Sequence, residues 1–127
     1  MKNGRSDFGL VHLQRIEQAV AIGDVGQAER EIVSALKECK KLGLLFDSVV
    51  QIAHSLAQQF CLARRYHDAE RLYLSVLSAR ENLFGADHFE LIDSLKRLTV
   101  IMRETRSDSE AQRVAFRAGA IAMRRSA

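Results

Sequence analysis

The sequence predicts an all-α fold, and three observations support this prediction. Proline is absent from the 127 residues, and proline is the residue that most strongly breaks helices. The abundant Ala, Leu, Arg, Glu and Gln are all good helix formers. Apolar residues recur at helical spacing, whereas the sustained alternation of Val, Ile or Thr with polar residues that marks strands is missing. The length fits one domain, residues 1–127.

The apolar spacing predicts six helices, whose ends we place to within about three residues. Their ranges are 6–22, 25–42, 47–64, 67–84, 88–105 and 108–125.

The first two helices meet at a tight turn, Gly23-Asp24-Val25-Gly26. We expect Gly43 to end the second helix, because glycine readily adopts the conformation found at helix C-termini. The apolar side of the second helix consists of Ala28, Ile32, Ala35, Leu36, Cys39 and Leu42.

The third helix can be capped by Asp47 or Ser48. Its apolar residues are Val49, Ile52, Ala53, Leu56, Phe60 and Ala63. The fourth helix has the clearest pattern, one broad apolar stripe, and Gly85 ends it. This stripe consists of Ala69, Leu72, Tyr73, Val76, Leu77, Leu83 and Phe84.

The fifth helix begins after Asp87, which with Glu90 three residues later has the spacing of a capping box. Its apolar side consists of Leu91, Leu95, Leu98 and Met102. Ser107 or Asp108 can cap the sixth helix. The stripe of the sixth helix is made mostly of small residues: Ala111, Val114, Ala115, Ala118, Ile121 and Ala122.

The helices form an internal repeat. An offset of 42 residues lays Leu56 on Leu98 and Ala69 on Ala111, and an offset of 41 lays Ala28 on Ala69. Because the connections are short, neighbouring helices are expected to pack as antiparallel hairpins. One hairpin cannot bury its stripe alone, so stacked units would share a core. The three units are about 6–42, 47–84 and 88–125.

The second unit carries a family resemblance. Residues 56–60, 65–73 and Leu77 together resemble a tetratricopeptide repeat. The run 79–88, Ala-Arg-Glu-Asn-Leu-Phe-Gly-Ala-Asp-His, resembles the linker of the kinesin-light-chain-like subclass, whose repeat length matches the 42-residue offset. The first unit departs from the pattern, since Arg15 replaces a leucine. The resemblance implies a right-handed superhelical stack that binds a protein or peptide, as a scaffold or adaptor.

In such a stack, the first helix of each hairpin lines the concave face. Polar side chains at helical spacing on that face can hold an extended or a helical peptide, and the alternative is that they are simply solvated. The residues that the resemblance assigns to this face are Leu13, Glu17, Gln51, His54, Gln58, Cys61, Asp93, Lys96, Val100 and Arg103.

The sixth helix is a second candidate interface. An array that stops at this helix leaves apolar positions uncovered, and exposed apolar strips mark interfaces. We therefore expect a second copy of the chain or a partner subunit to cover it. The candidate residues are Arg113, Val114, Phe116, Arg117, Ile121 and Arg124.

The arginines of the last third leave a nucleic-acid-associated regulator open as an alternative. The net charge is only +3, but Arg113, Arg117 and Arg124 recur on one helical face, which Arg103 and Arg106 extend. Aromatic residues for base stacking are scarce there, so we favour a protein partner.

The sequence predicts neither an enzyme nor a cofactor or metal site. It lacks the Gly-x-Ser-x-Gly, Walker and Rossmann motifs. His54 and Cys61 share a helical face, but no zinc-ligand spacing occurs. The other cysteine, Cys39, lies among apolar residues, as reduced thiols of cytosolic proteins do. With no secretory signal and no run of about 20 apolar residues, a cytoplasmic protein without membrane contact is expected.

Overall fold

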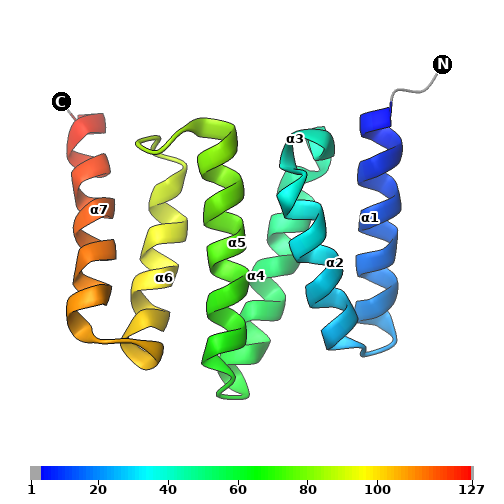
Figure 1. Cartoon of the computed structure of the whole chain (residues 1–127), viewed down its shortest axis with the longest axis horizontal. Coiled ribbons are helices and arrows are strands. Elements are labelled where there is room, and N and C mark those ends of the chain that lie inside the picture. Colours follow the sequence, from blue (N-terminus) through cyan, green and yellow to red (C-terminus); the bar gives the residue numbers. More distant parts are fainter. Residues whose placement is uncertain (1–3, 127) are drawn as a thin grey trace.

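The computed structural model describes residues 4–126, and these residues form helices without any strand (Figure 1). The all-α prediction is therefore confirmed. The helices are α1 (Gly4–Ala21), α2 (Val25–Lys37), α3 (Cys39–Leu42), α4 (Phe46–Leu62), α5 (Tyr66–Phe84), α6 (Leu91–Thr105) and α7 (Asp108–Ser126), with a short 3-10 helix, η1 (Gly43–Leu45), between α3 and α4.

The helices stand side by side in a row, with α1 at one end and α7 at the other, and consecutive long helices run in opposite directions (Figure 1). Helices adjacent in sequence pack together: α1 with α2, α4 with α5, α5 with α6, and α6 with α7. Helix α2 also packs against both α4 and α5. No helix among the described residues is long and apolar enough to cross a membrane.

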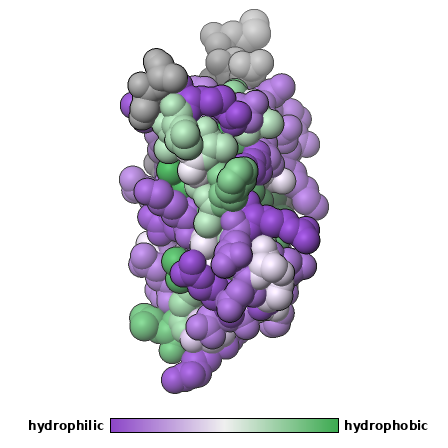
Figure 2. Space-filling view, turned by 90° about the vertical axis from the view of Figure 1, so that its left-hand side faces the viewer, coloured by the Kyte–Doolittle hydropathy of each residue, from purple (hydrophilic) through white to green (hydrophobic). Residues whose placement is uncertain are grey.

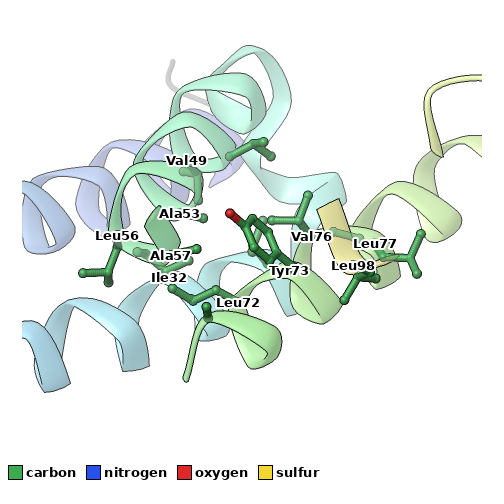
Figure 3. Close-up of a cluster of buried hydrophobic side chains, with 14 of the residues drawn as sticks. Ile32, Val49, Ala53, Leu56, Ala57, Leu72, Tyr73, Val76, Leu77 and Leu98 are labelled. Atoms are coloured by element: carbon green, nitrogen blue, oxygen red, sulfur yellow. The ribbon is translucent and has the colours of Figure 1, made fainter. Parts of the chain in front are cut away.

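One hydrophobic cluster runs through the row and takes buried side chains from α1 to α7. Its middle part joins α2, α4, α5 and α6, and Tyr73 lies at the centre with its hydroxyl group toward the α4 side chains (Figure 3). Ala57 of α4 and Ala69 of α5 are both fully buried, which agrees with a close approach of these two helices. Leu72 and Val76 of α5 are also fully buried, so α5 contributes heavily to the core.

The predicted second helix is interrupted. It ends at Lys37 rather than at residue 42, and Glu38 (φ −107°, ψ 40°) separates it from α3. After the break, Cys39 is 3% exposed and its Sγ lies 3.7 Å from the carbonyl oxygen of Ala79. A continuous helix was therefore the wrong prediction. The apolar residues before and after Glu38 are buried alike, so apolar spacing alone does not reveal the break. Gly43 does end α3, with φ 55°.

The start of α4 also differs from the prediction. Asp47 and Ser48 lie inside the first turn of the helix, not at its cap, and Leu45 is the N-cap without a side-chain hydrogen bond. The 3-10 helix η1 leads directly into α4, and its backbone supplies the bond from the Phe46 N–H to the Gly43 carbonyl oxygen. Because backbone groups continue the helical path, no side-chain cap forms there.

The predicted capping box before α6 is absent. The helix begins at Leu91, and Glu90 is an N-cap without a side-chain bond. The Glu90 N–H instead donates to Nδ1 of His88 at 3.1 Å, and Asp87 binds Arg124 at 2.9 Å. The Asp87 carboxylate therefore binds Arg124 of α7, whereas the local sequence pattern predicted that it would cap α6.

Other predicted ends are confirmed. Gly85 ends α5 with φ 93°, a value that L side chains rarely adopt. Of the two candidates before α7, Ser107 is the acceptor, with its Oγ 3.3 Å from the Glu110 nitrogen. Asp24 caps α2 by accepting from the Gln27 N–H at 3.1 Å, which closes the turn after α1.

Candidate functional site

A cluster of polar side chains connects α4, α5 and α6. Asp93 of α6 accepts from Nε of Arg97 at 3.0 Å and from Arg80 of α5 at 3.3 Å. Arg80 also donates to the hydroxyl of Ser94 at 2.8 Å, and Ser94 is buried. Arg80 thus joins α5 to α6 through Asp93 and Ser94, in addition to the apolar packing, whereas the Asp93–Arg97 pair lies within α6.

Helix α4 enters the same cluster through His54. Its imidazole ring lies 5.8 Å from the ring of Tyr73, centroid to centroid. The ring also interacts electrostatically with Asp93, Arg97 and Arg80. Burial and the two arginines lower the pKa of His54 to about 4, against a smaller opposing effect of Asp93. His54 is therefore neutral near pH 7, and its Nε2 is buried without a hydrogen-bond partner among the described residues.

The same surroundings shift the other groups of the cluster. Burial raises the pKa of Asp93, but hydrogen bonds and charge from Arg97 and Arg80 overcome it, so the pKa is lowered overall. The pKa of Tyr73 is raised, chiefly by burial and against the hydrogen bond from Arg97. Burial likewise raises the pKa of the Cys61 thiol. At neutral pH the cluster holds a charged Asp93 between two arginines, with neutral His54, Tyr73 and Cys61 beside it.

Exposed side chains on α4 and α6 accompany this cluster. Gln51 and Gln58 of α4 are exposed, as are Lys96 and Arg103 of α6. Val100 stands between the two α6 cations on the same helical side and is 62% exposed. Neither Lys96 nor Arg103 has an ion pair within the part of the chain that the structure describes.

The remaining two residues assigned to the concave face lie on α1. Leu13 is partly buried against the core, and Glu17 is exposed. Helix α1 packs with α2, α3 and η1, so these two residues are not part of the cluster of α4 to α6. The structure therefore brings His54 and Asp93 of the predicted set together and places Cys61 near Tyr73. Gln51, Gln58, Lys96, Val100 and Arg103 are exposed on the same two helices, α4 and α6.

Four members of the cluster were not among the predicted site residues, and one of them, Ser94, is a small buried residue of α6. Tyr73 belongs to an apolar stripe and was treated as core, while Arg80 carries no local signal. Arg97 lies four residues after Asp93, a spacing that allows an ion pair on one helix. That spacing is the only sequence signal that could have added a residue to the site.

Helix α7 divides the predicted interface residues between two sides. Ile121 is 1% exposed and belongs to the core, so it offers no surface to a partner, and Val114 packs partly against the core. Phe116 is 79% exposed, and Arg113 is exposed. Arg117 and Arg124 instead contact the end of α5 and the connection between α5 and α6.

Arginines from the last third form ion pairs within the chain. Arg106 binds the buried Glu70 at 2.6 Å. Arg117 binds Glu81 at 2.6 Å and the Ala86 carbonyl oxygen at 2.9 Å. A further ion pair joins Arg124 to Asp87, and the Arg125 guanidinium lies 4.0 Å from the ring centroid of Phe89. The charge available for phosphate groups is correspondingly reduced.

Other possible sites are poorly developed. Two hollows of about 340 and 410 Å³ on the α2–α5 side share Val33 and Lys37 in their walls. Neither contains a residue of the α4–α6 cluster. Among the described residues, no three His, Cys, Asp or Glu side chains are grouped so as to hold a metal ion.

No protein-family model matches the chain, and no curated protein matches it in sequence.

Proposed function

We propose that this chain is a non-catalytic protein-interaction module, a tetratricopeptide-like stack of hairpins that holds a peptide or partner protein across α4 and α6. The packing of α4 with α5 and of α6 with α7 supports the hairpin units. The offset of 42 residues between Leu56 and Leu98 supports their equivalence, since both residues are buried.

The observation that carries this proposal is the polar cluster of His54, Tyr73, Arg80, Asp93 and Arg97. In this cluster both α4 and α6 contact α5, through His54 with Tyr73 and through Asp93 with Arg80. A binding face benefits from such a fixed base, because a pre-organised surface loses less entropy on association. Around this base, exposed amides on α4 and exposed cations on α6 remain available to a partner.

The side chains favour binding over catalysis. With a pKa of about 4, His54 is a weak base, and general bases work best with a pKa near the operating pH. The raised pKa of Cys61 keeps the thiol protonated, whereas the thiolate is the nucleophile. The arginine pairs of α7 also favour a protein partner over nucleic acid, because Arg117 and Arg124 are already engaged.

A capture experiment tests the proposal. Tagged chain would be used to capture proteins from native extract, beside a variant that combines Gln58→Ala, Lys96→Ala and Arg103→Ala. All three side chains are exposed, so we expect an unchanged circular dichroism spectrum. We expect the specifically captured proteins to fall by about tenfold or more, since charged and amide contacts to the partner are lost.

A matched control combines Gln14→Ala, Arg30→Ala and Lys40→Ala, which removes the same three side-chain types from exposed positions on α1, α2 and α3. The control should capture the same proteins as the unchanged chain. Equal capture by all three proteins would remove the α4–α6 face from the proposed function.

A further inference from the structure

The outward side of α7 has a regular seam. Its residues are spaced alternately by three and four positions: Ser109, Gln112, Phe116, Gly119 and Met123. All five are exposed. Phe116 and Met123 stand out, with 79% and 75% exposure. Viewed from this end, the molecule shows hydrophobic surface in the upper half, between hydrophilic side chains (Figure 2).

The spacing of this seam is that of a two-stranded coiled coil. The opposite side of α7 is already used, because Ala111, Ala118 and Ile121 are buried. Residues separated by alternating steps of three and four occupy the a and d positions that face a partner helix. Phe116 and Met123 then fall at equivalent a positions, with Gly119 between them at d. A side chain at Gly119 would meet nothing within 4 Å, so the glycine leaves room for a partner helix to approach.

Two unpaired charges lie on either side of the seam. Asp108 precedes the first seam residue and Arg113 follows the second, which places them at the g and e positions. Both are exposed, and neither has an ion pair among the described residues. In a parallel pair of identical helices, a g residue meets the e residue five positions later on the partner, so Asp108 of each copy meets Arg113 of the other.

The opposite orientation is less favourable. In an antiparallel pair, e positions face e positions and g positions face g positions, so Arg113 of one copy would lie near Ala120 of the other. Neither Asp108 nor Arg113 would then gain an opposite charge. The small side chains of Ala115 and Ala120 flank the middle of the seam and permit close contact in either orientation. The charges therefore select the parallel arrangement.

We propose that α7 pairs in parallel and in register with α7 of a second copy of this chain, through Phe116 and Met123 and two Asp108–Arg113 ion pairs. This surface is separate from the α4–α6 face, so the proposal stands or falls independently of the proposed function. Only two bulky apolar side chains per copy are covered, and we expect a weak dimer with a dissociation constant on the order of tens of micromolar.

Sedimentation equilibrium of the full chain tests the association. The 14.3 kDa chain should approach twice that mass at about 200 µM and one copy at about 1 µM. Phe116→Glu should weaken association by about tenfold or more, because it places two carboxylates opposite each other in the seam. Leu44→Glu is the control, since Leu44 is fully exposed and lies in η1, away from α7; it should dimerise as the unchanged chain does.

Charge exchange tests the orientation. Asp108→Lys and Arg113→Glu should each weaken dimerisation by about threefold to tenfold, since each places like charges together. The double variant should recover the original dissociation constant to within about twofold, with helix content checked by circular dichroism. Failure to recover in a fully helical double variant would overturn the parallel register.

Two further results would overturn the proposal altogether. One is a monomer at about 200 µM, or a dimer that Phe116→Glu leaves unchanged. The other is a monomeric chain that captures a different protein through this surface and loses it in the Phe116→Glu variant, which would assign the seam to that protein.

Discussion

At the scale of single residues, the arginines of the last third of the chain differ in whether they form ion pairs. Arg106 and Arg117 bind acids 36 positions earlier in the chain, and Arg113 remains unpaired among the described residues. The helical face that these residues share in the sequence therefore does not form one basic surface. The partner that we propose for α7 would meet single charges of both signs rather than a continuous cationic strip.

His54 predicts a pH dependence of stability. Its pKa is about 4 in the folded chain and about 6.5 in an unfolded one, so the unfolded state binds more protons between these values. The free energy of unfolding therefore falls as the pH is lowered from about 6.5 to about 4. The full shift corresponds to about 3 kcal/mol, which we reduce to about 1–2 kcal/mol because the half-buried ring is screened by water.

Urea titrations at a series of pH values measure this contribution. His54→Gln should flatten the dependence between pH 6.5 and pH 4, because a neutral amide replaces the titrating ring. His67→Gln is the control, since the His67 side chain is 77% exposed, and it should retain the slope. The explanation fails if His54→Gln and the unchanged chain lose stability in parallel.

At the scale of elements, the segment between α5 and α6 illustrates how a tertiary contact redirects a local signal. Residues 85–90 are held by α7 through Arg117 at Ala86 and Arg124 at Asp87. Rings of Phe84, His88 and Phe89 stack in succession at 4.9 and 4.5 Å. The segment is thus a packed connection, and α6 starts only after it.

Glycine substitutions test the conformation of this connection. Gly85 has φ 93°, so Gly85→Ala should lower the free energy of unfolding by about 1–2 kcal/mol, because a side chain disfavours that backbone conformation. Gly26→Ala is the matched control inside α2, where alanine is the better helix former and stability should stay equal or rise by up to about 1 kcal/mol. Urea titrations that rank the two variants in the reverse order would contradict this conformation at Gly85.

At the scale of the whole molecule, one hydrophobic cluster links the helices from α1 to α7. A shared core makes partial unfolding costly, because loss of one helix exposes the apolar side of its neighbours. Helix α5 is central to this effect, since it packs against α2, α3, α4 and α6. We therefore expect the chain to unfold as one cooperative unit.

A substitution at Leu72 tests whether the chain unfolds as one cooperative unit. Its side chain is fully buried, so Leu72→Ala should lower the free energy of unfolding by about 2–5 kcal/mol. Leu62→Ala, at an 87% exposed position, should change it by less than about 0.5 kcal/mol. Circular dichroism and tyrosine fluorescence should give coincident urea transitions. Separate transitions by the two probes would show that the helices do not share one unfolding unit.

The sequence alone determined the all-α class, most helix positions and much of the core. Leu72, Leu98 and Ile121 each belong to the apolar stripe of their own predicted helix, and all three are buried. Gly85 ends a helix as expected. These features depend on groups only a few positions apart, whose geometry the helix itself fixes. The three-repeat superhelix and the binding role stay predictions.

Only the tertiary structure decided which residues meet across helices. It brought His54 to Tyr73 and Arg97, joined Arg124 to Asp87, and broke the second helix at Glu38. Contacts of this kind depend on how each helix is rotated and shifted against its neighbours. The packing of many side chains sets the rotation and the shift of each helix together. The periodicity of a single helix therefore does not predict either of them.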